Sequence, residues 1–238
     1  MATRYSPKIV TDNLILCLDA GSSRSYSGSG SWKDLSNVNH DGTITGATFV
    51  PHTTAAGAAH FDFDGSNDNV DVGSLGTSGE FSESTISVWF QKDTQVSNYG
   101  NVFDCNYNVT TANKGPRMEV DIAGSVVRIY MGTDGGSYTT ISFGSLSNNT
   151  WYNLVLTVSP NGTGQDLKAY TDGDLINSST SSSSFLWDGD IADLYLGVGY
   201  TSARHFTGKI ATFQIYSKTL SAAEVEQNYI ALKGRFNN

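Results

Sequence analysis

The chain has 238 residues, a length suited to one large domain, and nothing in its composition marks a boundary between two. Its 11% aromatic and 16% charged residues are typical of a well-packed globular protein and exclude a disordered chain. The formal net charge is −9 and Lys and Arg form no cluster, which excludes nucleic acid and anionic membranes as partners.

Residues 1–12 predict an N-terminal arm ahead of the first strand. They hold no charged region followed by an apolar run, so we expect a protein made in a cytoplasm without a classical export signal. Residues 13–19 (NLILCLD) are apolar on both faces, as is typical of a central strand buried between layers. Cys17 lies in this run and Cys105 in another, and so sparse a pair predicts buried free thiols.

The next segments predict a strand over residues 43–50 and then a hairpin. Residues 59–63 alternate between apolar and polar, and Val70 with Val72 resumes the alternation after the turn residues 64–69 (DGSNDN). Asp, Gly and Asn are the residues that tight turns favour. The sequence therefore predicts two antiparallel neighbours joined by this turn.

The middle of the chain predicts short strands at near-regular spacing. Residues 84–91 place Ile86, Val88 and Phe90 on one face and Trp89 on the other, and we expect Trp89 and Trp151 in the core. Further strands are predicted over residues 101–105, 117–122, 125–131, 138–143, 151–158, 167–172 and 194–198. The serine-rich run at residues 178–184 predicts an exposed loop. Such spacing is typical of a β-sandwich or jelly roll.

The closing segment predicts a strand followed by a helix. Strict alternation would place Ile210, Thr212, Gln214 and Tyr216 on one face of the strand and Lys209, Ala211, Phe213 and Ile215 on the other.

The closing helix is predicted over residues 221–232. Ser221 stands three residues before Glu224, which is the spacing of a capping box. Val225, Tyr229 and Leu232 would share one face of this helix. The tail at residues 233–238 is expected to fray or to dock on an acidic neighbour.

Six segments carry a resemblance to a known family. They are LILCLDAG (residues 14–21), SWKDLSNVNHDGTI (31–44), FDFDGSNDNVDV (61–72), STISVWF (84–90), WYNLVLTVSPNGTGQDLKAYTDGDLI (151–176) and FTGKIATFQIYSKTLSAAEVEQNY (206–229). In this order they resemble a laminin-G-like, concanavalin-A-like lectin/glucanase domain. The resemblance implies one domain over residues 1–238, of the all-β class. Its fold would be a two-sheet antiparallel jelly-roll sandwich with one short C-terminal helix.

The chain also resembles single-domain structural proteins of tailed bacteriophages, in its short N-terminal arm and in its tail LSAAEVEQNYIALKGRF (residues 220–236). This resemblance implies a noncatalytic virion structural protein, a component of the head decoration, the neck or a tail fibre. It would lie on the virion surface as a homo-oligomer, contact other virion proteins and bind surface glycans as an additional role. The alternative is a carbohydrate-binding module or lectin without a virion role.

A glucan hydrolase is a third hypothesis, because relatives on this fold carry catalytic carboxylates along one strand. Glu119 and Asp121 have the i, i+2 spacing that shares a strand face. However, Ala123 and Gly124 stand where that motif carries its second Glu, so a retaining mechanism lacks its acid. We therefore expect no enzyme, and two polar residues on a solvent-facing side of the strand.

Calcium is the only cofactor that the sequence raises. Asp64, Asn67 and Asp68 offer hard oxygen ligands within one turn, and the family resemblance implies calcium in rim loops. The same residues are also ordinary turn formers, which leaves both interpretations open. Asp188 and Asp190, beside Trp187, form a second candidate.

Sugar binding would need an exposed aromatic platform with planar polar groups nearby. Tyr99 and Tyr107 flank Asn101 and Asn106, and Tyr200 precedes Arg204 and His205. The candidate ligand-binding residues are Trp187, Tyr99, Tyr107, Asn106 and Tyr200.

Overall fold

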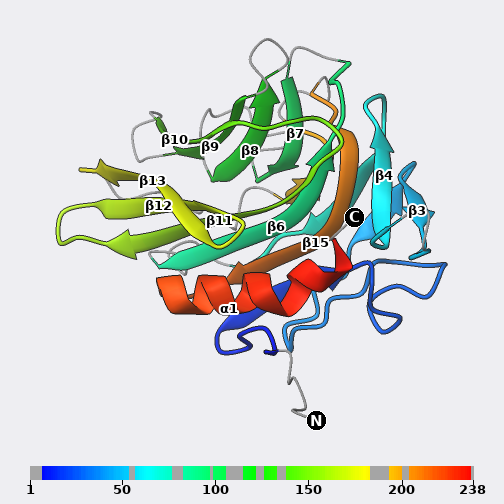
Figure 1. Cartoon of the computed structure of the whole chain (residues 1–238), viewed down its shortest axis with the longest axis horizontal. Coiled ribbons are helices and arrows are strands. Elements are labelled where there is room, and N and C mark those ends of the chain that lie inside the picture. The colour runs from blue at the N-terminus through cyan, green and yellow to red at the C-terminus, as the bar shows by residue number, and fades with distance from the viewer. Residues whose placement is uncertain are drawn as a thin grey trace.

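The architecture is a sandwich of two antiparallel sheets with a helix on one side (Figure 1). This computed structural model describes residues 7–53, 57–76, 83–96, 99–105, 115–121, 126–132, 138–182, 193–199 and 204–236. Within these ranges, fifteen strands and one α-helix are present. The predicted all-β fold, a jelly-roll sandwich with one short C-terminal helix, is confirmed. No helix in the described ranges is long and apolar enough to cross a membrane.

The first sheet contains the longest strands. Its order is β13 (Asp174–Ser181), β12 (Gln165–Thr171), β11 (Trp151–Pro160), β6 (Ser84–Lys92), β15 (Thr207–Tyr216), β4 (His60–Asp64) and β3 (Thr48–Val50), and β1 (Leu14–Asp19) also pairs with β15.

The second sheet packs against one face of the first. Its order is β10 (Tyr138–Ser145), β9 (Val126–Gly132), β8 (Pro116–Asp121), β7 (Tyr99–Asp104), β14 (Leu194–Leu196), β5 (Asn69–Gly73) and β2 (Thr43–Thr45).

The main core lies between the two sheets. Ile86, Val88 and Phe90 of β6 point into it, as the alternation predicted. Rings from both sheets meet there, since Phe103 of β7 and Phe213 of β15 make an edge contact with centroids 5.2 Å apart. Both sheets therefore share one apolar interior.

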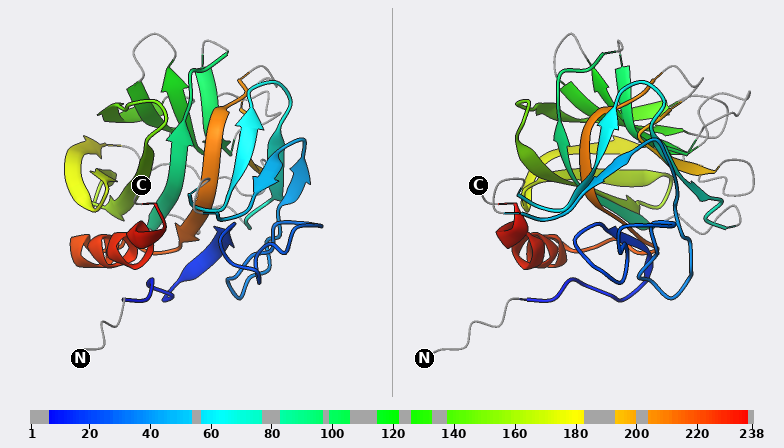
Figure 2. Two further views of the ribbon diagram at one scale, coloured as in Figure 1. Left: turned by 45° about the vertical axis from the view of Figure 1, so that its right-hand side comes forward. Right: turned by 90° about the vertical axis from the view of Figure 1, so that its right-hand side faces the viewer.

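Helix α1 (Ala222–Leu232) covers the other face of the first sheet and runs into the 3-10 turn Lys233–Arg235 (Figure 2). The predicted capping box is confirmed, with reciprocal bonds between Ser221 and Glu224. Beneath the helix, Trp89 stacks on Phe236 with ring centroids 3.9 Å apart, and Leu232 packs in the same cluster. Trp89 therefore belongs to a core, as predicted, but to the one between helix and sheet.

The strict alternation predicted for β15 is wrong. The register with β6 shifts between Ile210 and Thr212, which marks a β-bulge at Ala211. As a result Ile210 and Phe213 both point into the main core, and Ala211 packs under the helix. Because side chains alternate along a strand, one extra residue moves every side chain that follows it to the opposite face of the sheet.

The central position predicted for residues 13–19 is also wrong. β1 pairs with the C-terminal half of β15, and in the described chain it has no second neighbour. Its two faces are nevertheless covered, because Leu16 and Leu18 enter the main core and Cys17 lines a cavity with Leu232 of the helix.

Two turns near the N-terminus connect different sheets. Residues 43–50 form β2 and β3, and residues 60–73 form β4 and β5, with β2 pairing to β5 and β3 to β4. The predicted hairpin and the predicted single strand are therefore arches between the layers. Gly46 has a φ of +77° and packs against the Asp68 carboxylate, where a Cβ atom would lie 2.1 Å from Oδ1. Only glycine fits this contact.

The predicted serine-rich loop begins within a strand. Residues 178–181 belong to β13, which pairs with β12 along its length. Residues 178–181 (SSTS) carry no apolar alternation that would mark a strand, so pairing with β12 and not the local sequence decides this conformation.

Both cysteines are buried free thiols, as predicted. Burial, and then the charge of Asp19, raises the pKa of Cys17 to about 12. Burial also raises the pKa of Cys105 well above its ordinary value.

We expect neither thiol to react with a disulfide reagent in the native protein near pH 8, because the thiolate is the attacking form. Both should react after unfolding in denaturant. Thiol titration with and without denaturant measures this, and rapid labelling of the native protein would contradict it.

Candidate functional site on the outer face of the second sheet

The outer face of the second sheet, turned away from the sandwich core, is the candidate site. Along β8, Met118 and Val120 point into the core, so Arg117, Glu119 and Asp121 point outward. Helix α1 lies on the opposite side of the molecule (Figure 1), so no helix of the described ranges covers this face.

The strand register aligns polar and aromatic side chains in a row across this face. The pairings join Asp104 to Tyr195, Asp104 to Arg117, and Arg117 to Tyr130. Paired residues in a sheet lie about 5 Å apart. The full row is Thr43, Asp71, Tyr195, Asp104, Arg117, Tyr130 and Thr140.

Glu119 forms the charged centre of the face. It is only 3% exposed, and its Oε2 accepts a hydrogen bond from Arg204 Nη1 and lies 3.9 Å from Arg117 Nε. Arg204 is held above β7, because its carbonyl oxygen accepts a hydrogen bond from the Asn101 N–H at 3.3 Å. The solvent-facing position predicted for Glu119 is therefore wrong, since Arg204 covers it, and a buried carboxylate requires such a partner.

Tyrosine rings surround this centre and stack on its guanidinium groups. Arg117 lies 4.4 Å above the Tyr130 ring and 5.8 Å from that of Tyr138. Arg204 lies 4.9 Å above the Tyr99 ring. Tyr138 is 51% exposed and Tyr99 38%, so these stacks fix rings whose surfaces reach solvent.

Protonation of one ring is also set by this environment. Burial, and then the charge of Glu119, raises the pKa of the Tyr130 hydroxyl above its ordinary value. The hydroxyl is therefore protonated at neutral pH and can donate a hydrogen bond.

The half of the row that runs from β5 to β7, away from Tyr130 and Tyr138, is acidic. Asp71 accepts hydrogen bonds from the Gly73 N–H and from the Tyr195 hydroxyl, both at 2.9 Å. Burial, and then the charge of Asp71, raises the pKa of Asp193. Fully buried Asp104 accepts a hydrogen bond from Asn101 Nδ2 at 2.8 Å.

Of the predicted ligand-binding residues, Tyr99 lies on this face. Trp187, Tyr107, Asn106 and Tyr200 lie outside the described residues, as do Asp188 and Asp190.

Sequence reasoning missed Arg117, Tyr130 and Tyr138, which come from three neighbouring strands. Their outward alternation was a usable signal. The strand register that brings the three side chains together could not be read from the sequence.

The predicted calcium residues lie in the arch between β4 and β5. Asp68 Oδ2 accepts the Asp64 N–H at 2.9 Å, and Asp64 Oδ1 accepts the Ser66 N–H at 2.8 Å. The Asn67 carbonyl accepts a bond from Asn69 Nδ2 at 3.2 Å. Over the described ranges, no group of three or more His, Cys, Asp or Glu side chains could hold a metal ion. These contacts are turn bonds, and calcium stays a prediction.

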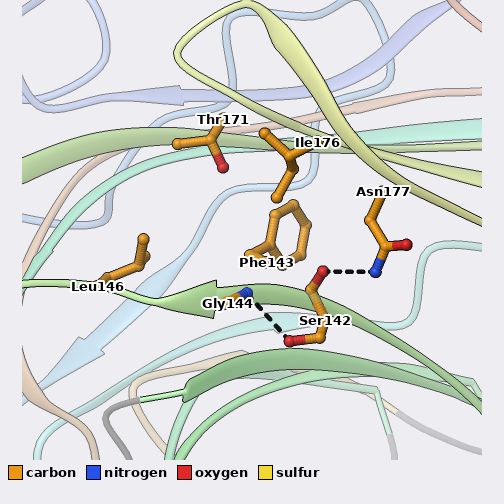
Figure 3. Close-up of a pocket in the computed structure, with 7 residues that line it drawn as sticks. All are labelled: Ser142, Phe143, Gly144, Leu146, Thr171, Ile176 and Asn177. Atoms are coloured by element: carbon orange, nitrogen blue, oxygen red, sulfur yellow. Dashed lines mark hydrogen bonds between the residues drawn. The ribbon is translucent and has the colours of Figure 1, made fainter.

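An open groove of about 400 Å³ lies at the edge of the sandwich, between β10 of the second sheet and the strands β12 and β13 of the first (Figure 3). Phe143, Leu146 and Ile176 supply its apolar lining. Its polar groups bond to each other, since Asn177 Nδ2 donates to the Ser142 carbonyl at 2.9 Å. Among the described residues that line the groove there is no charged side chain, and the ring of Phe143 is buried, so the groove offers a sugar less than the outer face does.

The carboxylates of β8 are arranged for charge pairing. Asp121 Oδ2 lies 3.5 Å from Arg128 Nη1, and Glu119 is held by Arg204 and Arg117. A retaining glycosidase needs one free carboxylate nucleophile and one protonated acid about 5 Å apart. The arrangement suits binding better than this chemistry.

A protein-family model matches most of the chain. Residues 64–226 match the family model described as the concanavalin A-like lectin/glucanases superfamily. No curated protein sequence matches the chain.

Solved structures with the same fold include three binding domains. The botulinum neurotoxin type G receptor-binding domain has a TM-score of 0.64 and 18% identity, over 92% of this chain and 51% of that chain. The binding domain of Paraclostridial Mosquitocidal Protein 1 has a TM-score of 0.67 and 18% identity, over 91% and 52%. The ligand-binding domain of botulinum neurotoxin serotype D, solved with N-acetylneuraminic acid, has a TM-score of 0.65 and 18% identity, over 94% and 52%. The chain thus spans about half the length of these structures, and the likeness shows the fold.

Proposed function

Because the chain belongs to the concanavalin A-like lectin/glucanases superfamily, we propose that it is a carbohydrate-binding, lectin-like domain. The glycan lies on the outer face of the second sheet, over the tyrosine rings that surround Glu119. The proposal includes no catalytic step.

The observation that carries the proposal is that the tyrosine rings of this face are held in place by each other and by guanidinium groups. Tyr138 makes an edge contact with Tyr130 at 5.3 Å, and Arg117 lies over Tyr130. Aromatic faces pack on the C–H surface of a sugar ring, while nearby polar groups bond its hydroxyls. Rings that are already held lose little conformational entropy on binding.

Two neighbours of the same fold support this class of ligand. One is the complex of the botulinum neurotoxin serotype D domain with N-acetylneuraminic acid, and another is the neurotoxin DC binding domain in complex with SialylT. Because this chain covers about half of each of those chains, their ligands indicate only the class.

The test is a glycan-array screen of the purified protein, with one arm in calcium and one in chelator. We expect specific binding that weakens about two- to tenfold in Tyr138→Ala, because a stacked aromatic contact is worth about 0.5 to 1.5 kcal/mol. A loss of binding in chelator would also support the predicted calcium site at Asp64, Asn67 and Asp68.

The matched control is Leu175→Ala, which removes a side chain that is 53% exposed on β13 of the first sheet. It should bind as the wild type does. An array without specific binding in either arm would overturn the proposal, as would full binding by Tyr138→Ala.

The virion surface location, the contacts with other virion proteins and the homo-oligomer remain predictions. Light scattering of the array samples measures the oligomer. A mass-spectrometric inventory of phage particles that lacks the protein would refute the virion role.

A further inference from the structure

We infer that the outer face of the second sheet selects neutral glycans and rejects those that end in a sialic acid. This inference rests on the proposed glycan-binding function. It also separates this chain from the neighbours of the same fold that were solved with N-acetylneuraminic acid.

The first argument is that every arginine described on this face already has a carboxylate partner. Arg117 and Arg204 share Glu119, and Arg128 Nη1 lies 3.5 Å from Asp121 Oδ2. A sialic acid carboxylate would have to compete with these partners for the same guanidinium groups. Replacing Glu119 would leave a side chain that is 3% exposed without its counter-ions, which a protein interior tolerates poorly.

The second argument is the sign of the charge on this face. The described outward side chains include four carboxylates, those of Asp71, Asp104, Glu119 and Asp121, against three guanidinium groups. The whole chain carries a formal charge of −9. An anionic ligand is therefore repelled both at the site and at a distance.

The third argument is that the face offers what neutral hydroxyls need. Asp71 and Asp121 are partly exposed acceptors, and the Tyr130 hydroxyl is a donor at neutral pH. Sugar hydroxyls can donate to the first two and accept from the third. The same groups give a carboxylate ligand a single donor against two repelling charges.

The test is an array on which each neutral glycan is printed beside its sialylated form. We expect the wild-type protein to bind the neutral member of each recognised pair at least tenfold more tightly. The variant Asp121→Asn removes the partner of Arg128 and one negative charge, so the discrimination should fall severalfold and at low salt most strongly.

The matched control is Asp166→Asn, which removes one negative charge from β12 of the first sheet. It should leave the discrimination unchanged. Equal or tighter binding of the sialylated members overturns the inference while the glycan-binding function stands. Absence of binding to every glycan overturns the proposed function, and this inference with it.

Discussion

Trp89→Ala is expected to lower the free energy of unfolding by about 3 to 5 kcal/mol, the usual cost of deleting a large buried aromatic side chain. Trp89 is 3% exposed and lies between the first sheet and the C-terminal helix. Its ring stacks on Phe236 at 3.9 Å and on Tyr229 at 5.6 Å, so both the helix and the turn after it depend on this ring. Its indole nitrogen makes no hydrogen bond within the described part of the chain, so the expected loss is one of packing.

The same substitution should also release helix α1. An isolated helix of this length is not stable in water, so its docking face decides whether it forms. Urea denaturation measures the stability, and hydrogen exchange measures whether the amides of α1 lose protection more than those of β6 do.

Ile230→Ala is the control, because this helix side chain is 38% exposed and its removal should cost less than about 0.5 kcal/mol. Unchanged protection of α1 in Trp89→Ala would show that the capping box and the remaining contacts hold the helix alone.

Local patterns predicted the parts of the fold that depend on local physics. The alternation of Ile86, Val88 and Phe90 is a property of any extended strand, and the Ser221 and Glu224 spacing is a property of a helix N-terminus. Both predictions are confirmed. The near-regular spacing of the strands already indicated a sandwich or jelly roll, and the family resemblance specified the concanavalin A-like form.

The errors arise where a distant partner decides the structure. The turn at residues 64–69 has the composition of a hairpin, yet β4 and β5 pair with β3 and β2 in different sheets. The bulge at Ala211 follows from pairing with β6 and has no local signal. The turn residues determine where the chain bends, but they do not determine which sheet each flanking strand joins.

The candidate site shows the same division. Tyr99 was found as an aromatic residue beside a planar amide, but its partner Arg204 is 105 positions further along the chain. Glu119 was found as a glucanase-like carboxylate, and its burial under Arg204 could not be read from β8 alone. Residue types predict which chemistry is present, and the register decides which groups meet.

Glu119→Gln is expected to lower the free energy of unfolding by about 2 to 3 kcal/mol. Breaking a buried ion pair costs about 3 to 5 kcal/mol, but the Arg204 side chain is 29% exposed and water recovers part of this. Glutamine keeps the shape of the side chain and removes only its charge. The cost therefore reports the electrostatic role of Glu119 and not its packing.

The same variant should change what the outer face binds. With Glu119 neutral, Arg117 and Arg204 lose their shared counter-ion. Discrimination against sialylated glycans should therefore shrink, while the glycan keeps its contact with Tyr138. Guanidinium denaturation and the paired glycan array measure the two effects.

Asp12→Asn is the control, because Asp12 pairs with Lys218 at 3.0 Å while 74% exposed, and its loss should cost less than about 0.5 kcal/mol. A Glu119→Gln variant as stable as this control would mean that the arginines find other partners, which would contradict the assignment of Glu119 as the charged centre of the face.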